Sequence, residues 1–190
     1  MPKLWSQTIE THRHEVRDAI METTWALAAE HGPLAVTMSQ IAQETGIGRA
    51  TLYKYFPNVE TILRANHERH VVEHLGRLNT VGHSNKGPRE RLHAVSLMYA
   101  RMRHHRSRHG TVELSALVHT PDLVSGAEGE IFTLFEGLLT EAIASGDVLV
   151  KLSPSEQAVY VIHALGAAES LPSDAAVGRL VRLTLAALLS

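Results

Sequence analysis

Residues 37–58 read TMSQIAQETGIGRATLYKYFPN, and this stretch encodes two short helices with a tight break between them. Thr37 and Gln40 have the spacing of a capping box, which predicts the start of the first helix. Gly46 can adopt the left-handed conformation that ends a helix without a Cβ penalty. Gly48 then precedes a second helical segment. The pattern predicts a helix-turn-helix.

The second of these helices carries side chains that suit contact with DNA. Arginine, lysine, threonine and tyrosine donate hydrogen bonds to phosphates and base edges, and an alanine permits close approach in a groove. We therefore predict that this helix binds the major groove. The residues concerned are Arg49, Ala50, Thr51, Tyr53, Lys54 and Tyr55.

Length and composition restrict the class of protein. A chain of 190 residues with 44% hydrophobic residues can bury a sizeable core, as one domain or two small ones. The absence of cysteine excludes disulfides, thiolate catalysis and thiol redox sensing. We find neither an apolar run long enough to span a bilayer nor a secretory signal at the N-terminus. We expect a cytoplasmic protein that does not bind membranes.

The charge balance restricts how DNA contact is made. The formal net charge is −2, and residues 1–66 carry six Lys or Arg against seven acids. Many nucleic-acid-binding domains are basic overall. Contact with DNA must therefore come from a local cluster on one face rather than from a general positive field.

Almost the whole chain has helical periodicity, which predicts an all-α fold of nine helices. Three small helices come first, and six form a bundle behind them. We expect residues 1–57 to form a helix-turn-helix DNA-binding domain and residues 58–190 a ligand-binding and dimerisation domain. Apart from the two short helices, the expected helices cover residues 14–30, 59–78, 89–109, 111–119, 122–145, 153–171 and 174–189. Residues 80–88 have the composition of a loop.

Residues 17–63, about a quarter of the chain, resemble the tetracycline-repressor (TetR) family of transcriptional regulators, and TLYKYF at residues 51–56 is the most specific part of this match. The shared positions are Arg17, Ile20, Gly32, Thr37, Ile41, Ala42, Gly46, Leu52, Tyr53, Tyr55, Phe56, Glu60 and Leu63. The resemblance implies a homodimer, a DNA operator with two-fold symmetry, and a C-terminal cavity for a small-molecule effector that controls DNA release.

By position, the resemblance assigns individual roles. Thr37 and Tyr55 match places where the family contacts phosphate. The recognition surface that it implies comprises Arg49, Ala50, Thr51, Tyr53 and Lys54, and we include Gly48 in the DNA-binding set. Val59 departs from the family, which usually has a lysine there, so one phosphate contact is missing. Lys3 and Arg13 lie in an N-terminal arm that could compensate for it.

Structural interpretations compete with these roles. Phe56, Leu52 and Ile47 are expected in the core, and Tyr53 could also pack there. Arg49 and Lys54 could be ordinary solvated charges, although the surrounding pattern favours DNA contact.

A ligand site is expected among the helices of the C-terminal domain, where apolar walls with a few polar groups would suit a largely apolar effector. The candidate pocket residues are His93, Ser96, Tyr99, Met102, Leu117, His119, Phe132, Phe135 and His163.

Histidines and arginines form two further clusters. His67, His70 and His74 share one helical face and could ligate Zn²⁺, which would make the chain a metal-responsive regulator. With 13 histidines in the chain, we favour a solvated or inter-domain face. Residues 101–109, RMRHHRSRH, could bind an anion or attract DNA, but a charged, exposed helix end is favoured.

We find no catalytic motif, such as a G-x-S-x-G elbow, an HExxH pair or a phosphate-binding glycine loop. We therefore expect no enzyme activity and no cofactor. A helical binding module without DNA activity remains an alternative to a regulator.

The last two helices are expected to pair with their copies in a homodimer, because their apolar surface exceeds what one bundle covers. Such an interface would contain Val161, Leu165, Leu180, Val181, Thr184, Leu185 and Leu188.

Overall fold

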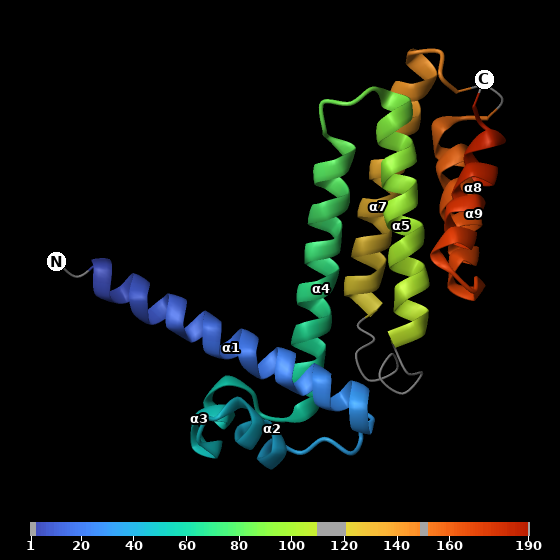
Figure 1. The fold of residues 1–190 in the computed structure, drawn as a ribbon. Helices are drawn as coiled ribbons and strands as arrows, with labels where there is room; N and C mark the ends of the chain where they lie inside the picture. The colour runs from blue at the N-terminus through green and yellow to red at the C-terminus, as the bar shows by residue number, and fades with distance from the viewer. Residues whose placement is uncertain (1–2, 110–120, 149–151, 190) are drawn as a thin grey trace. The chain divides into compact units, whose positions relative to one another are not determined.

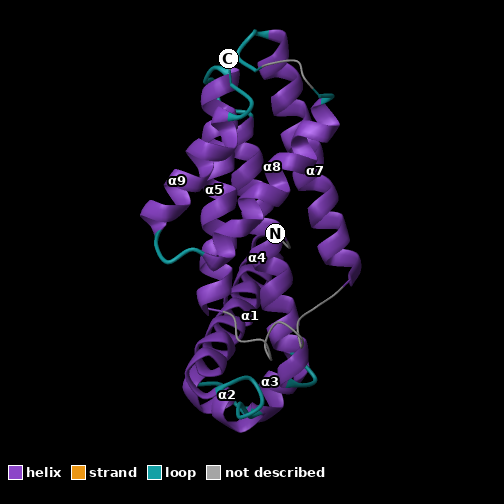
Figure 2. Ribbon diagram, turned by 90° about the vertical axis from the view of Figure 1, so that its right-hand side faces the viewer, coloured by secondary structure: helices purple, strands orange, loops and turns teal. Residues whose placement is uncertain are grey.

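The computed structural model describes residues 3–109, 121–148 and 152–189, and within these ranges the regular structure is helical (Figures 1 and 2). The elements are α1 (Lys3–His31), α2 (Met38–Thr45), α3 (Arg49–Tyr55), α4 (Val59–Gly82), α5 (Pro88–His109), α7 (Pro121–Ala144), α8 (Pro154–Gly166), the 3-10 helix η1 (Ala167–Ser170) and α9 (Asp174–Ala186). The described ranges hold no strand, only an isolated antiparallel bridge between Val148 and Leu189. The all-α prediction is confirmed.

Several helix boundaries differ from the prediction. α1 begins at Lys3 rather than near residue 14, and α4 continues to Gly82 instead of ending at Leu78. α4 continues because Leu78 is fully buried and Val81 packs on the same core, so tertiary contacts override the polar composition that follows. The helix expected at residues 153–171 ends at Gly166, and η1 follows it. The expected helix at residues 111–119 lies outside the described residues.

The described residues form two compact units, one up to His70 and the other from Val71 onward. We call them unit 1 and unit 2. α4 contributes residues to both, because the division falls within it. The functional boundary that we expected at residue 57 stays a prediction.

Unit 1 contains the helix-turn-helix, and its local signals are confirmed. Thr37 caps α2: its hydroxyl accepts from the Gln40 backbone N–H at 3.3 Å, while the Thr37 N–H donates to Gln40 Oε1 at 2.9 Å. Gly46 ends α2 with φ +73°, in the left-handed region. At the start of α4, Asn58 Oδ1 accepts from the Thr61 N–H at 2.9 Å. Each helix end thus satisfies backbone groups that would otherwise lack partners.

A hydrophobic cluster holds these helices of unit 1 together. It contains Ile20, Met21, Ala28, Val36, Ile41, Ala42, Leu52, Phe56, Ile62 and Leu63. Leu52 on α3 and Ile41 on α2 are both fully buried. Because α3 turns this side inward, the residues on its opposite side face outward.

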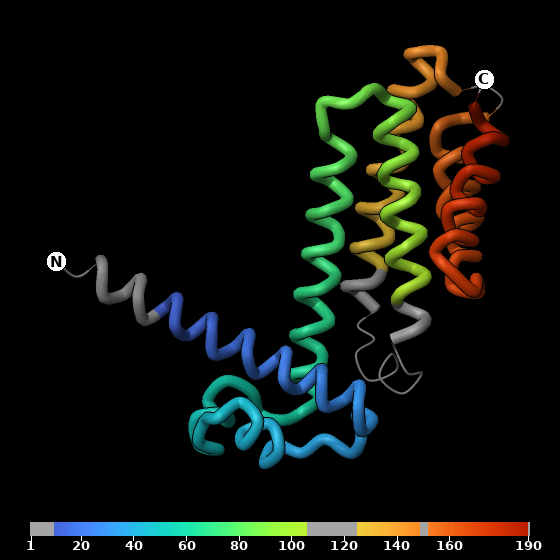
Figure 3. Tube along the Cα trace, viewed as in Figure 1, coloured from blue at the N-terminus to red at the C-terminus, as the bar shows by residue number. Residues whose placement is uncertain are grey.

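Unit 2 is built around α5, which packs against α7, α8, η1 and α9. The trace in Figure 3 shows α5 beside α7 on one side and α8 with α9 on the other. The rings of Tyr99 and Phe135 meet edge to face with centroids 5.8 Å apart in this core. Fully buried Leu92, Leu139 and Leu165 come from three different helices.

A capping box starts α8. The Ser153 hydroxyl and backbone N–H donate to Glu156 Oε2 at 2.7 and 2.8 Å, and Pro154 occupies the first helical turn. The hydrogen bond from the Ser153 hydroxyl is the main cause that holds the pKa of the Glu156 carboxyl below its usual value. The hydrogen bond from the Ser153 backbone N–H is the second cause. The cap is therefore complete at neutral pH and is lost as the pH falls through that lowered pKa.

The predicted dimer residues require a correction. Six of the seven lie buried inside unit 2 itself, and Leu180 is half-buried against the same core. The buried six are Val161, Leu165, Val181, Thr184, Leu185 and Leu188. The reason is that α8 and α9 use their most apolar stripe to cover α5. The large apolar side chains that these two helices leave exposed are Val159, Tyr160 and Leu183, at 48%, 41% and 72%.

None of the described helices combines the length and the hydropathy needed to cross a membrane.

We predict that Leu139→Ala lowers the free energy of unfolding by about 2–5 kcal/mol, because it leaves a cavity where a fully buried side chain stood. The matched control is Thr140→Ala, one residue further along α7 on its exposed side, with an expected change of at most about 0.5 kcal/mol. Urea unfolding measures both values, and equal losses would contradict the assignment of this face to the core.

Candidate DNA interface and ligand groove

The outward face of α3 is polar and basic. Arg49, Ala50, Thr51 and Lys54 are exposed, and Tyr53 is 49% exposed. Within the described residues neither Arg49 nor Lys54 forms an ion pair, and α3 contains no acid. Their charges are therefore available to an anionic partner.

The two predicted phosphate contacts have different surroundings. The exposed Thr37 hydroxyl takes part in the α2 capping box and donates to Gln40 Oε1 at 2.8 Å. Tyr55 is half-buried and packs against the cluster of unit 1. Gly48, the remaining predicted DNA residue, is the exposed N-cap of α3. The structure thus places all eight predicted DNA residues on or beside α2 and α3.

The residues expected in the core lie there. Leu52 and Phe56 are buried, and Ile47 packs against the same cluster. Val59, where the family usually has lysine, is half-buried in this cluster and supplies apolar contact instead of charge. The Arg17 guanidinium lies over the Phe56 ring, 5.3 Å from its centroid.

An ion-pair network that sequence inspection did not reveal joins α1 to α4 in unit 1. Arg69 Nη1 lies 3.0 Å from Asp18 Oδ1, and Arg69 Nη2 lies 3.5 Å from Glu22 Oε1. Arg69 also donates to the side-chain oxygen of buried Asn66 at 3.0 Å. Local sequence patterns do not predict these contacts, because the partners lie more than 40 residues apart in the chain.

The histidine face on α4 does not support the metal-site alternative. Within the described residues no group of three potential ligands is close enough to hold a metal ion. His67, His70 and His74 are each half-buried, and the His70 ring packs edge-on against Trp25 with centroids 5.8 Å apart. Helical spacing aligned these histidines, but packing directs one of them to an aromatic neighbour.

The arginine-histidine cluster is less exposed than expected over its first half. His104 is fully buried, and its Nδ1 lies 3.1 Å from the Ala168 carbonyl oxygen. Arg103 pairs with Glu169 at 2.7 Å. These residues connect α5 to η1, so this part of the cluster serves packing within unit 2.

The seven predicted ligand residues that the structure describes differ in burial. Ser96, Tyr99 and Phe135 are buried in the core, and the Ser96 hydroxyl has no hydrogen-bond partner among the described residues. Met102 and Phe132 are half-buried, whereas His93 and His163 are exposed. Leu117 and His119 lie outside the described residues. Because these two residues were expected to form part of its wall, the predicted pocket stays a prediction.

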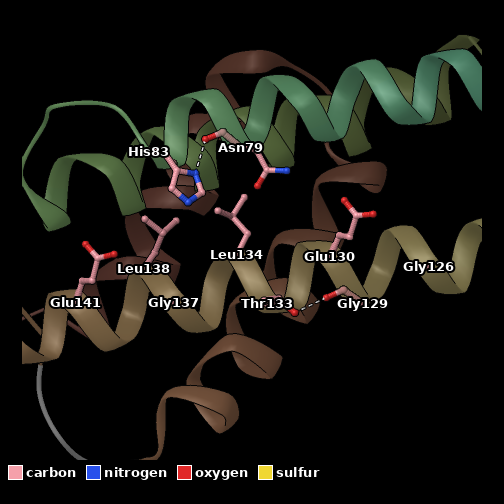
Figure 4. A pocket seen from close by; sticks show the side chains of 11 residues that line it. Asn79, His83, Gly126, Gly129, Glu130, Thr133, Leu134, Gly137, Leu138 and Glu141 are labelled. Atoms are coloured by element: carbon pink, nitrogen blue, oxygen red, sulfur yellow. Dashed lines mark hydrogen bonds between the residues drawn. The ribbon is translucent and has the colours of Figure 1, made fainter.

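A groove of about 560 Å³ lies elsewhere in unit 2, between the end of α4 and the face of α7 (Figure 4). It is lined by Asn79, Gly82, His83, Gly126, Gly129, Glu130, Thr133, Leu134, Gly137, Leu138 and Glu141. Its volume falls in the range typical of small-molecule sites. None of the seven predicted pocket residues that the structure describes lines it.

Glycines keep this groove open. A Cβ at Gly126, Gly129 or Gly137 would meet no atom within 4 Å, so larger side chains at these positions would occupy the groove. Gly82 does the opposite, because its missing side chain lets α4 approach Leu134; a Cβ there would lie 2.7 Å from Leu134 Cδ1. The signal was present in the sequence: three glycines recur on one face of a helix.

Comparison with known proteins supports the fold and the helix-turn-helix. The family model described as "Bacterial regulatory proteins, tetR family" matches residues 20–65. The HTH-type transcriptional regulator BetI of Brucella anthropi is 33% identical over 96 residues, covering 50% of this chain and 46% of that protein. The match thus spans about half the length of such curated relatives.

Solved structures share the fold along most of the chain. A TetR/AcrR-family transcriptional regulator from Thermobifida fusca has a TM-score of 0.75 at 22% identity, covering 89% of this chain and 96% of that one. A putative transcriptional regulator from Saccharomonospora viridis, in complex with choline, has a TM-score of 0.72 at 19% identity, covering 93% and 99%.

Proposed function

We propose that the chain is a ligand-responsive transcriptional repressor of the tetR family of bacterial regulatory proteins, whose family model matches its residues 20–65. We propose a cytoplasmic homodimer that binds a DNA operator with two-fold symmetry. A small effector releases the dimer from this operator. The observation that carries the proposal is the exposed basic face of α3, which has no acid of its own.

The physical argument for DNA contact starts from burial. Leu52 is fully buried, so the opposite side of α3 must face outward. That side presents two cations without ion-pair partners among the described residues, together with Thr51 and Tyr53. A helix of this kind supplies both phosphate attraction and donors for base edges. The net charge of −2 is compatible with this, because the contact is local.

We predict distinct effects for the two cations of α3, measured on an operator selected from random double-stranded DNA. Arg49→Ala, if the side chain reads a base, weakens binding by about 1–3 kcal/mol and relaxes sequence preference at one position. Lys54→Ala weakens binding to all DNA sequences alike. It also lowers the slope of log affinity against log salt concentration by about one. The matched charge control is Lys86→Ala, which lies outside unit 1. Unchanged operator affinity in both α3 variants would contradict the proposed interface and favour the alternative of a helical binding module without DNA activity.

Tyr55 tests whether a half-buried ring also contacts phosphate. Tyr55→Phe keeps the packing and removes only the hydroxyl, so we expect an unaltered melting temperature and DNA binding weaker by about 0.5–1.5 kcal/mol. Fluorescence anisotropy and thermal unfolding measure the two quantities on the same sample. Full DNA affinity in this variant would assign Tyr55 a packing role alone.

The dimer that we propose uses the outer faces of α8 and α9. Their inner faces cover α5, and the side chains left outside include Val159, Tyr160 and Leu183. Apolar residues on two neighbouring helices form a surface that association with a second copy would remove from water. Two-fold pairing of α8 and α9 gives a four-helix interface and presents two recognition helices to two half-sites.

We predict that Val159→Glu and Leu183→Glu each shift the protein toward monomer and weaken operator binding at least tenfold, because each buries a charge in the interface. The control is Val72→Glu, which changes an apolar side chain that is 63% exposed on α4. Sedimentation velocity at micromolar concentration measures the association state. Wild-type protein that sediments as a monomer would contradict both the interface and the symmetric-operator proposal.

For effector response we propose the groove between α4 and α7. α4 lines this groove with Asn79 and Gly82, and the N-terminal half of the same helix packs in unit 1. A ligand that binds one position of α4 more tightly than another would therefore change the DNA affinity of unit 1. The choline bound to the Saccharomonospora viridis protein supports small-molecule binding on this fold. Leu134 and Leu138 supply the apolar wall for a largely apolar effector.

A further inference from the structure

We propose that the groove between α4 and α7 selects a ligand whose apolar body carries a protonated amine with N–H donors. This inference deepens the ligand-responsive function proposed above and rests on it. It follows from the charges, hydrogen bonds and missing side chains of the residues that line the groove.

The charge of the groove is negative. Two carboxylates, Glu130 and Glu141, line it, and its lining includes no lysine or arginine. Glu141 is already neutralised, because Arg91 pairs with it while also donating to the Gly82 carbonyl at 3.0 Å. Glu130 forms no ion pair with any residue that the structure describes. One carboxylate is therefore uncompensated at this surface, and it favours a cation.

The hydrogen-bonding groups of the groove are mostly acceptors. The Thr133 hydroxyl donates its hydrogen to the Gly129 carbonyl at 2.9 Å, which leaves only oxygen lone pairs for a ligand. His83 Nδ1 lies 2.8 Å from the Asn79 carbonyl oxygen. Because a carbonyl only accepts, Nδ1 must carry the hydrogen, and Nε2 of the neutral ring is then an acceptor. Figure 4 shows both bonds.

These acceptors favour a ligand head group with N–H donors. The Glu130 carboxylate, the Thr133 oxygen and His83 Nε2 all require a donor, and the Asn79 amide supplies the lining's remaining side-chain donors. A primary ammonium carries a positive charge, which Glu130 favours, and three N–H groups, which serve as hydrogen-bond donors. A carboxylate ligand would meet repulsion from Glu130, and a neutral apolar ligand would displace water from these exposed acceptors without replacing its hydrogen bonds.

The groove also distinguishes an amine from a quaternary ammonium. Quaternary ammonium ions have no N–H donors and are recognised by aromatic cages. The eleven lining residues include no phenylalanine, tyrosine or tryptophan. The apolar body of the ligand has its own place, because Leu134 and Leu138 form a wall and the glycines of α7 leave open space.

Calorimetric titration of the full chain without DNA tests this inference. The probes are octylammonium, octyltrimethylammonium and octanoate, which share one apolar tail. We expect octylammonium to bind about three- to tenfold more tightly than octyltrimethylammonium, and octanoate to bind most weakly. Glu130→Gln should weaken octylammonium binding by about the same factor. The matched control is Glu128→Gln, an exposed carboxylate on α7 outside the groove.

Equal affinity for the three probes would overturn the inference. So would equal losses in Glu130→Gln and Glu128→Gln, since they would indicate a general negative field rather than a site. Operator binding is measured separately by gel shift. Amine selectivity in a protein that binds no DNA would support this inference and contradict the proposed function. DNA release by other compounds without amine selectivity would overturn the inference alone.

Discussion

The burial of Leu52 and Phe56 in one cluster with Ile41 is the contact on which the proposed DNA interface depends. It fixes the rotation of α3 about its own axis, and so decides which residues of a short helix face outward. The same constraint acts in unit 2, where α8 and α9 turn Val161 and Leu185 toward α5. In both units the proposed functional surface consists of what the core leaves exposed.

The groove is the place where burial is incomplete. α7 covers the core with Phe135 and Leu139 but presents glycines and polar groups along its groove-facing side. The α4 residues that line this groove belong to a helix whose other half packs in unit 1, partly through Arg69 and its two carboxylate partners. One helix therefore carries the proposed ligand site and a packing surface of the DNA-binding unit, which is the mechanical basis of the response that we propose.

Helix types and most helix ends were predictable because their causes are local. Thr37 with Gln40, and Ser153 with Glu156, form caps over three residues, and Gly46 ends α2 by its own left-handed conformation. The boundary at the end of α4 was not predictable in this way. Burial of Leu78 extends that helix into a polar segment, and this burial depends on residues far away in the chain.

The sequence by itself determined the all-α class, the helix-turn-helix and the residues on the outer face of α3, since capping and 3.6-residue periodicity act within one helix. Tertiary structure alone decided which neighbour each apolar stripe meets. We expected Val161 and Leu185 to face a partner chain, but both are buried in their own core, and His93, which we expected in a ligand pocket, is exposed. Periodicity gives the face of a helix, but only packing says what lies against that face.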